Sequence, residues 1–303
     1  MPHDYRIIDA FCAEPFGGNP AAVVLDAEDL DDATMQRIAT EFNLSETTFV
    51  LPAADPAAGV QFRWFTPAVE VDLCGHATVA GVHALHEAGQ LADRLRPDGI
   101  LRIETRSGIL EAQLEIIGND PRTRQVWLEL PRPTLRAFVL KPSILREGLR
   151  IEEDAVVSRI PVMMTGDRDV ILFVRGVGVL RAIRPNFSVL GEQCAHAGVR
   201  GMLVATTGSL PPHVQVETRF FAPAAGIHED PVTGSATGSL LAYMVLHGLI
   251  AVKDGLAGLT CLQGLPGIRS GLVRALGRVD GTTLTDVQIG GRATTVMAGT
   301  LVV

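Results

Sequence analysis

Two stretches of this chain, residues 63–81 and 219–238, carry nearly the same sequence pattern. The first reads RWFTP at 63–67 and CGHAT at 74–78, and the second reads RFFAP at 219–223 and TGSAT at 233–237. Each copy predicts a strand that ends at a proline, a loop with acidic residues, and a helix entered through a glycine. Because the copies lie about half the chain's length apart, they predict a duplicated fold whose halves share one site.

The length of 303 residues also favours two domains. Turn-forming residues at 118–121 predict the boundary between two β-rich stretches. We expect an N-terminal half at 1–119, joined by the last strand at about 288–303, and a C-terminal half at 120–287. The class is predicted to be α+β, with each half a β-rich, barrel-like sheet around a central helix and the halves facing across a cleft.

Local patterns predict the individual elements. Asp31 or Asp32 can cap a helix that runs to Phe42 and stops at Asn43, and residues 44–46 form a connection to the next strand. Further helices are expected at 76–88, 189–197 and 235–247. Strands are expected at 6–11, 21–25, 47–51, 101–105, 109–117, 125–130, 170–175 and 202–206, with a meander from 272 onward.

Composition limits the partners of the chain. A net charge of −8 without a basic cluster argues against nucleic-acid binding, which needs gathered Lys and Arg. The charged N-terminus does not resemble a signal peptide, and the apolar run at 240–252 is shorter than the roughly 20 residues that cross a bilayer. We therefore expect a cytoplasmic protein with no nucleic-acid or membrane partner.

The two helix N-termini are the first candidate binding features. A helix N-terminus presents unpaired N–H groups and a partial positive charge, which suit a carboxylate. Gly75 and Gly234 allow a ligand to approach the backbone closely, and Ser235 follows the second glycine. The alternative is that Ser235 only caps its helix and the glycines only make turns, but the repetition favours binding.

Three side chains near these helices can move or hold protons. Glu46, if half-buried, would have a raised pKa and serve as a proton carrier, whereas a solvated loop acid is the alternative. Asp230 could accept a hydrogen bond from a substrate amine or from His76, or only shape the turn before a proline. His76 at a helix N-terminus is expected to be neutral, and a packed or capping histidine is the alternative.

Cys74 is a thiol at the first helix N-terminus. Racemases that need no cofactor use two opposed cysteines, but the second copy carries Thr233, a far poorer base, so Cys74 is predicted to be a small buried residue. The other cysteines are far apart, and no HxxxH or HExxH pair is present. We expect no metal and no cofactor.

Four segments resemble the phenazine-biosynthesis PhzF-like isomerase family, a branch of the diaminopimelate-epimerase fold. They are FGGNPAAV at 16–23, NLSET at 43–47, DLCGHAT at 72–78 and GIHEDPVTGSA at 226–236. The resemblance extends over nearly the whole chain. It implies two similar α+β domains, a homodimer and no metal or organic cofactor.

The resemblance also implies roles for single residues. Glu46 matches the family's proton-shuttling acid, and His76, Asp230 and Ser235 match residues that position the substrate. Asn19 lies in the first matching segment and is a predicted substrate-binding residue, and the amides of Gly75 and Gly234 would hold a substrate carboxylate.

We expect a cofactor-independent isomerase that moves a proton on a small carboxylate-bearing, cyclic or aromatic-precursor substrate. One alternative is an epimerase or dehydratase of an amino or imino acid that uses Cys74 and Thr233. Another is a non-catalytic protein that binds small acids.

Overall fold

The computed structural model describes residues 2–118 and 124–303, and the chain divides into two compact units. Unit 1 comprises Met1–Glu129 and Gly290–Val303, and unit 2 comprises Leu130–Ile289. The predicted boundary turn lies outside the described residues, apart from Gly118. The division falls ten residues later than we expected from the sequence, because β8 (Arg124–Leu130) pairs with β7 (Gly108–Ile116) of unit 1.

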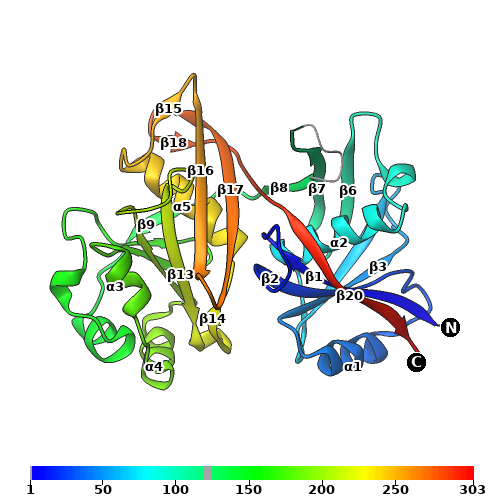
Figure 1. Cartoon of the computed structure of the whole chain (residues 1–303), viewed down its shortest axis with the longest axis horizontal. Coiled ribbons are helices and arrows are strands. Elements are labelled where there is room, and N and C mark those ends of the chain that lie inside the picture. The colour runs from blue at the N-terminus through cyan, green and yellow to red at the C-terminus, as the bar shows by residue number, and fades with distance from the viewer. Residues whose placement is uncertain (1, 119–123) are drawn as a thin grey trace. The chain divides into compact units, whose positions relative to one another are not determined.

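Among its described residues, unit 1 contains two α-helices. Its C-terminal strand pairs with its first strand (Figure 1). The remaining elements of unit 1 are β1 (His3–Ala10), β2 (Asn19–Val24), α1 (Asp32–Phe42), β3 (Glu46–Leu51), β4 (Val60–Phe65), β5 (Glu70–Val71), α2 (Gly75–Glu87), a 3₁₀ turn (Ala92–Arg94), β6 (Ile100–Thr105) and β20 (Ala293–Leu301).

Unit 2 contains three α-helices and a longer set of strands. Its elements are β9 (Leu135–Ala137), a π-helix (Ile144–Leu149), a 3₁₀ turn (Glu153–Ala155), β10 (Met163–Thr165), β11 (Asp169–Phe173), α3 (Val177–Ala182), α4 (Phe187–Ala197), β12 (Gly201–Thr206), β13 (Val216–Ala222), a 3₁₀ turn (Pro223–Ala225), β14 (Ile227–Asp230), α5 (Gly234–Leu246), β15 (Val252–Lys253), β16 (Leu256–Leu265), β17 (Arg269–Asp280), β18 (Thr283–Leu284) and β19 (Val287–Gly291).

The two units repeat one strand order. In unit 1, β2 and β3 are parallel, β4 is antiparallel to β3 and parallel to β6, and β6 and β7 form a hairpin. In unit 2, β11, β12, β13, β16 and β17 pair in the same sequence of directions. The predicted α+β class and the duplication are therefore confirmed.

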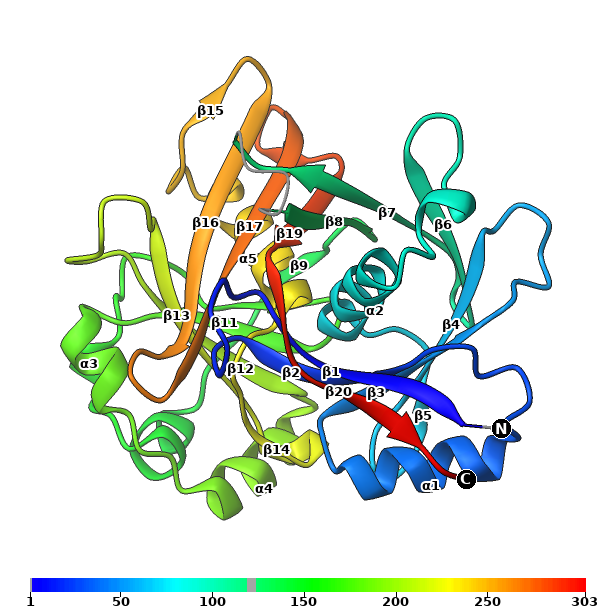
Figure 2. The ribbon, with the colours of Figure 1, turned by 45° about the vertical axis from the view of Figure 1, so that its right-hand side comes forward.

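Each unit surrounds one 13-residue helix with strands (Figure 2). Helix α2 packs against β1, β2, β3, β4 and β20, and α5 packs against β16, β17 and β18. Both helices are buried on nearly all sides, so they lack the polar face of a surface helix. This explains the runs of small and apolar residues in both sequences, and it confirms a central helix in each half.

The predicted caps of α1 are present. The carboxylate of Asp31 accepts a hydrogen bond from the backbone N–H of Thr34 at 2.8 Å, and Asn43 adopts the left-handed conformation that ends the helix. The connection after Asn43 is shorter than expected, because Glu46 is already the first residue of β3. Six of the described strands were not predicted as such: β5, β9, β10, β14, β15 and β16. The longest of them, β16, contains two glycines, which the sequence pattern treats as turn formers.

The arginine at the start of each repeat copy, Arg63 or Arg219, forms a corresponding ion pair. Arg63 donates two hydrogen bonds to Glu70, at 2.7 and 2.9 Å, and Arg219 donates two to Glu229, both at 2.7 Å. Each pair joins the strand before the loop to the short strand after it. The paired geometry shows that the two copies share a local structure as well as a sequence.

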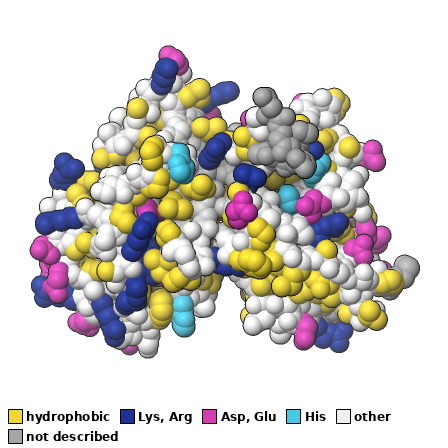
Figure 3. Space-filling view, viewed as in Figure 1, with side chains coloured by type: hydrophobic (Ala, Val, Ile, Leu, Met, Phe, Trp, Pro, Cys, Tyr) yellow, Lys and Arg dark blue, Asp and Glu magenta, His cyan; other side chains and the backbone are white. Residues whose placement is uncertain are grey.

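On the face drawn in Figure 3, Lys and Arg side chains are interspersed with acidic and hydrophobic ones. Among the described residues, no helix is both long enough and apolar enough to cross a membrane.

Candidate active site

The imidazole of His76 lies close to four side chains of unit 1. Its Nδ1 is 3.3 Å from Nδ2 of Asn19 and 3.5 Å from Sγ of Cys74. Its Nε2 is 3.3 Å from Oγ of Ser45 and 3.2 Å from Oε2 of Glu46. Residues separated by as many as 57 positions in the sequence therefore form one polar cluster in a largely buried place.

Two backbone features bring Asn19 and Glu46 to this cluster. Gly18 has a φ of +57°, and a Cβ there would lie 2.0 Å from the carbonyl oxygen of Ala10, so only glycine fits before Asn19. Strands β2 and β3 then run parallel, with Ala21 opposite Glu46. Both polar side chains consequently lie where β2 and β3 begin.

The hydrogen bonds are those of a neutral imidazole with its proton on Nε2. The amide Nδ2 of Asn19 can only donate, so Nδ1 of His76 accepts from it. Ser45 donates its hydroxyl proton to Oδ1 of Asn19 or to the Pro20 carbonyl, both at 3.3 Å. The Nε2–H group is left directed towards the Ser45 oxygen and the Glu46 carboxyl.

Burial raises the pKa of the Glu46 carboxyl, and the nearby side chains of Cys74 and Ser45 lower it by less. The Glu46 side chain is 14% exposed, and Oε2 lacks a well-directed hydrogen bond within the described residues. A carboxyl in this position holds its proton to a higher pH than an ordinary glutamate does. A raised pKa brings a carboxyl closer to neutral pH, in the direction that favours general acid–base catalysis.

The two central helices begin alike. Cys74 and Thr233 precede the first helical residues, have extended backbones, and make no side-chain capping hydrogen bond. Thr78 and Thr237 donate their hydroxyls to the carbonyls of Cys74 and Thr233, at 2.5 and 3.2 Å. The first-turn amides of Gly75 and Gly234 have no partner within the helix, as at any helix N-terminus.

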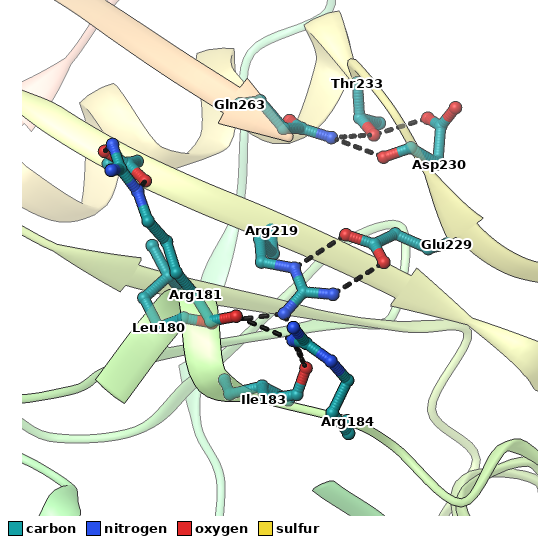
Figure 4. A network of polar contacts seen from close by, with 10 residues as sticks. Leu180, Arg181, Ile183, Arg184, Arg219, Glu229, Asp230, Thr233 and Gln263 are labelled. Atoms are coloured by element: carbon teal, nitrogen blue, oxygen red, sulfur yellow. Dashed lines mark hydrogen bonds and ion pairs between the residues drawn. The ribbon is translucent and has the colours of Figure 1, made fainter. Parts of the chain in front are cut away.

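A second polar cluster surrounds Asp230 in unit 2 (Figure 4). Thr233 donates its hydroxyl proton to Oδ2 of Asp230 at 2.5 Å. The amide Nε2 of Gln263 donates to the Thr233 hydroxyl at 2.9 Å and to the backbone carbonyl of Asp230 at 3.0 Å. Gln263 is fully buried on β16, so it fixes both Thr233 and Asp230 from the sheet.

This geometry bears on the predicted site residues. Glu46, His76 and Asn19 meet in one cluster beside Cys74, and Gly75 begins the helix that carries His76. Asp230 lies at the end of β14, while Gly234 begins α5 and Ser235 follows it half-buried. The roles in substrate binding and catalysis stay predictions.

Sequence reasoning missed two residues of these clusters, Ser45 and Gln263. Ser45 is next to the predicted site residue Glu46 in the sequence, and this position could have indicated that it belongs to the same cluster. Gln263 is a lone amide in a strand with apolar residues at most of its buried positions. A buried amide needs hydrogen-bond partners, so that pattern could have indicated a polar contact.

The cluster in unit 1 also has the composition of a metal site, which the sequence motifs did not predict. One donor atom from each of Glu46, Cys74 and His76 lies within 4.8 Å of the other two. The Thr233 hydroxyl, by contrast, already donates to Asp230 and accepts from Gln263. This engagement favours a positioning role for Thr233 over the role of a base.

Comparisons with known proteins find similar sequences over nearly the full length of this chain. Residues 8–299 match the family model of phenazine biosynthesis-like proteins, PhzC-PhzF. An uncharacterized isomerase of Clostridium acetobutylicum is 33% identical over 97% of this chain and 96% of its own. The trans-2,3-dihydro-3-hydroxyanthranilate isomerase of Pseudomonas fluorescens is 33% identical over 99% of both chains.

A solved structure gives the same result for the fold. The PhzF-family protein of Bacillus anthracis superimposes with a TM-score of 0.86, at 29% identity, over 100% of both chains. The chain therefore belongs to the phenazine biosynthesis-like, PhzC-PhzF, family of isomerases.

Proposed function

We propose that this chain isomerises a small carboxylate-bearing, cyclic or aromatic-precursor substrate by moving one proton, with Glu46 as the acid and base. The observation that carries the proposal is the buried Glu46 carboxyl beside a His76 ring whose proton position is fixed by Asn19. A related isomerase acts on trans-2,3-dihydro-3-hydroxyanthranilate, which makes that compound the first substrate to test.

The proposed reaction balances without a cofactor. The Glu46 carboxylate takes a proton from a carbon next to an unsaturated system, and the electron pair of that C–H bond moves into the system. The protonated Glu46 then returns the proton to a different carbon as the electrons shift back. A reaction that starts from the protonated carboxyl runs through the same two transfers in the opposite order.

The residues around Glu46 and Asp230 have proposed supporting roles. In unit 1, Asn19 and the first-turn amide of Gly75 would bind a substrate carboxylate and stabilise the developing negative charge, and in unit 2 Ser235 and the first-turn amide of Gly234 offer the same kind of donors. His76 would direct its Nε2–H group at Glu46 or at the substrate, and Asp230 would accept a hydrogen bond from a substrate amine or hydroxyl. The homodimer stays a prediction, which light scattering of the purified protein tests.

The test replaces Glu46 by glutamine, which keeps the shape of the side chain but cannot carry the proton. We expect turnover to fall by roughly 10²- to 10⁴-fold, the usual contribution of a general acid–base group. Binding of a substrate analogue should stay within a few-fold of the unmodified protein. The matched control is Glu41→Gln, because Glu41 is an exposed glutamate on α1.

Solvent exchange gives an independent readout. In deuterated water, the unmodified protein should place deuterium in substrate or product, and Glu46→Gln should place none. Full turnover in Glu46→Gln, with Glu41→Gln unchanged, would remove Glu46 from the mechanism.

A further inference from the structure

Glu46, Cys74 and His76 combine a carboxylate, a thiol and an imidazole. Their donor atoms, one from each residue, all lie within 4.8 Å of one another. Thiolate and imidazole groups favour zinc and related cations, whereas magnesium and calcium favour oxygen donors alone. The chemistry of the set therefore points to a thiophilic divalent cation.

The spacing also fits such an ion. Zinc holds sulfur at about 2.3 Å and nitrogen or oxygen at about 2.0–2.2 Å, so tetrahedral ligand atoms lie about 3.3–3.7 Å apart. The Cys74 Sγ is 3.5 Å from Nδ1 of His76, and the Glu46 Oε2 is 3.2 Å from Nε2. These two distances are to different ring nitrogens, and an ion binds only one of them. For one choice of donor atom from each residue all three lie within 4.8 Å of one another, so the side chains must close in by about 1 Å to hold the ion.

The surroundings suit a bound ion as well. Cys74 and His76 are each 8% exposed, which limits competition from water. A histidine that binds a metal usually directs its other ring nitrogen to a second protein group, and Asn19 and Ser45 lie against the two nitrogens. An ion on Nδ1 would leave the Nε2–H group to donate to the Ser45 hydroxyl oxygen, whereas an ion on Nε2 would turn Nδ1–H towards the Asn19 amide, which is itself a donor, so Nδ1 is the favoured ligand atom.

We propose that Glu46, Cys74 and His76 bind Zn²⁺ or a similar thiophilic cation as three protein ligands, and that the bound ion switches the isomerase off. Binding releases the thiol proton of Cys74 to solvent, together with the Glu46 proton where that carboxyl is protonated, and takes up the Glu46 carboxylate as a ligand. Inhibition rests on the proposed function, since it requires Glu46 to be the proton carrier, whereas the binding itself does not. The three ligands leave a fourth position for water.

Binding is tested with Co²⁺, a spectroscopic substitute for zinc, on the full chain without substrate. We expect one ion per chain, visible d–d bands of low symmetry, and a thiolate-to-cobalt charge-transfer band in the ultraviolet. Cys74→Ala should lose the charge-transfer band and bind more than about 100-fold more weakly, because even outer-shell changes weaken metal sites by 10- to 100-fold. Cys12→Ala removes a more exposed thiol elsewhere in unit 1 and should leave the spectrum unchanged.

Two outcomes would overturn the site: a cobalt spectrum without the thiolate band, or one that Cys74→Ala leaves intact in a protein that still unfolds cooperatively. His76→Ala removes a second proposed ligand, and a cobalt spectrum that this variant leaves intact would also overturn the site. Inhibition is measured separately, as loss of turnover with Zn²⁺ and recovery with a chelator. Cobalt binding together with undiminished turnover in saturating Zn²⁺ would keep the metal site, but it would refute its inhibitory role and the proposed part of Glu46.

Discussion

Replacing Arg219 by methionine should destabilise unit 2 more than the same change at Arg63 destabilises unit 1. Arg219 is 2% exposed. Its guanidinium donates two hydrogen bonds to Glu229, two to the carbonyls of Leu180 and Ile183, and lies 4.8 Å from the ring of Phe221. Methionine keeps much of the volume but none of these donors (Figure 4).

The magnitude follows from what the substitution leaves behind. Removing one partner of a buried ion pair costs about 3–5 kcal/mol, because the other charge stays buried without compensation. The Glu229 side chain is 24% exposed, which places the expected loss near the lower end, at about 3 kcal/mol. With a urea dependence of about 2 kcal/mol/M, the unfolding midpoint of unit 2 should fall by about 1.5 M.

Arg63 is the matched control, because its partner keeps a second cation. Glu70 also accepts a hydrogen bond from Arg106 at 3.0 Å, so Arg63→Met does not leave that carboxylate unpaired. We expect a loss of about 1 kcal/mol there, typical of a single net hydrogen bond. Asp32, the other partner of Arg63, is 80% exposed and is solvated in either protein.

The two units can be followed separately, because both tryptophans of the chain, Trp64 and Trp127, lie in unit 1. Tryptophan fluorescence should therefore report Arg63→Met, while far-ultraviolet circular dichroism reports both units. Arg219→Met should shift the dichroism transition by the larger amount, and adding Glu229→Gln should restore part of the loss. Equal small shifts for the two arginines, or no recovery in the double variant, would refute the argument that an unpaired Glu229 causes the loss.

Three further predictions concern the polar clusters. Gln263→Leu should lower kcat/KM by roughly tenfold, because Asp230 and Thr233 lose hydrogen bonds worth about 1–2 kcal/mol. Steady-state kinetics of Gln263→Leu, compared with Gln263→Glu, measures this loss. Cys74→Ala should move the limb of the pH–rate profile that reports Glu46 to higher pH, since Cys74 lowers that pKa while burial raises it. Because the pKa of Glu46 is raised on folding, its contribution to stability is present below the ordinary glutamate pKa and is lost as pH rises through the folded pKa. Glu46→Gln should therefore unfold at higher urea than the unmodified protein at pH 8, but not at pH 4, as judged by tryptophan fluorescence.

Local interactions explain which parts of the fold the sequence predicts. The ends of α1 depend on Asp31 and Asn43, each of which acts on its own turn of backbone, so the helix is predicted within a residue. The two central helices are also predicted from local sequence, because the repeated motif lies at the start of each helix. The domain boundary depends on the pairing of β8 with β7, which the turn signal between them did not convey.

The polar clusters depend on contacts across long stretches of chain. Asn19 and His76 are 57 residues apart, and Gln263 and Asp230 are 33 apart. Their meeting requires the parallel pairing of β2 with β3 and of β13 with β16, and sequence patterns do not specify which strands pair. The residue types were therefore recognisable, while the hydrogen bonds among them were not.

The duplication bears on the proposal that Glu46 alone carries the proton. Ala21 faces Glu46 across the parallel strands of unit 1, and the corresponding pair in unit 2 is Asp169 with Gly201. A Cβ at Gly201 would lie 2.4 Å from the ring of Phe220, so no acidic side chain fits there. Asp169 is itself held in an ion pair with Arg200. Because unit 2 has no acid at the position equivalent to Glu46, a two-base exchange with matched acids from both copies is disfavoured. A single group that both removes and returns the proton is the arrangement that this divergence supports.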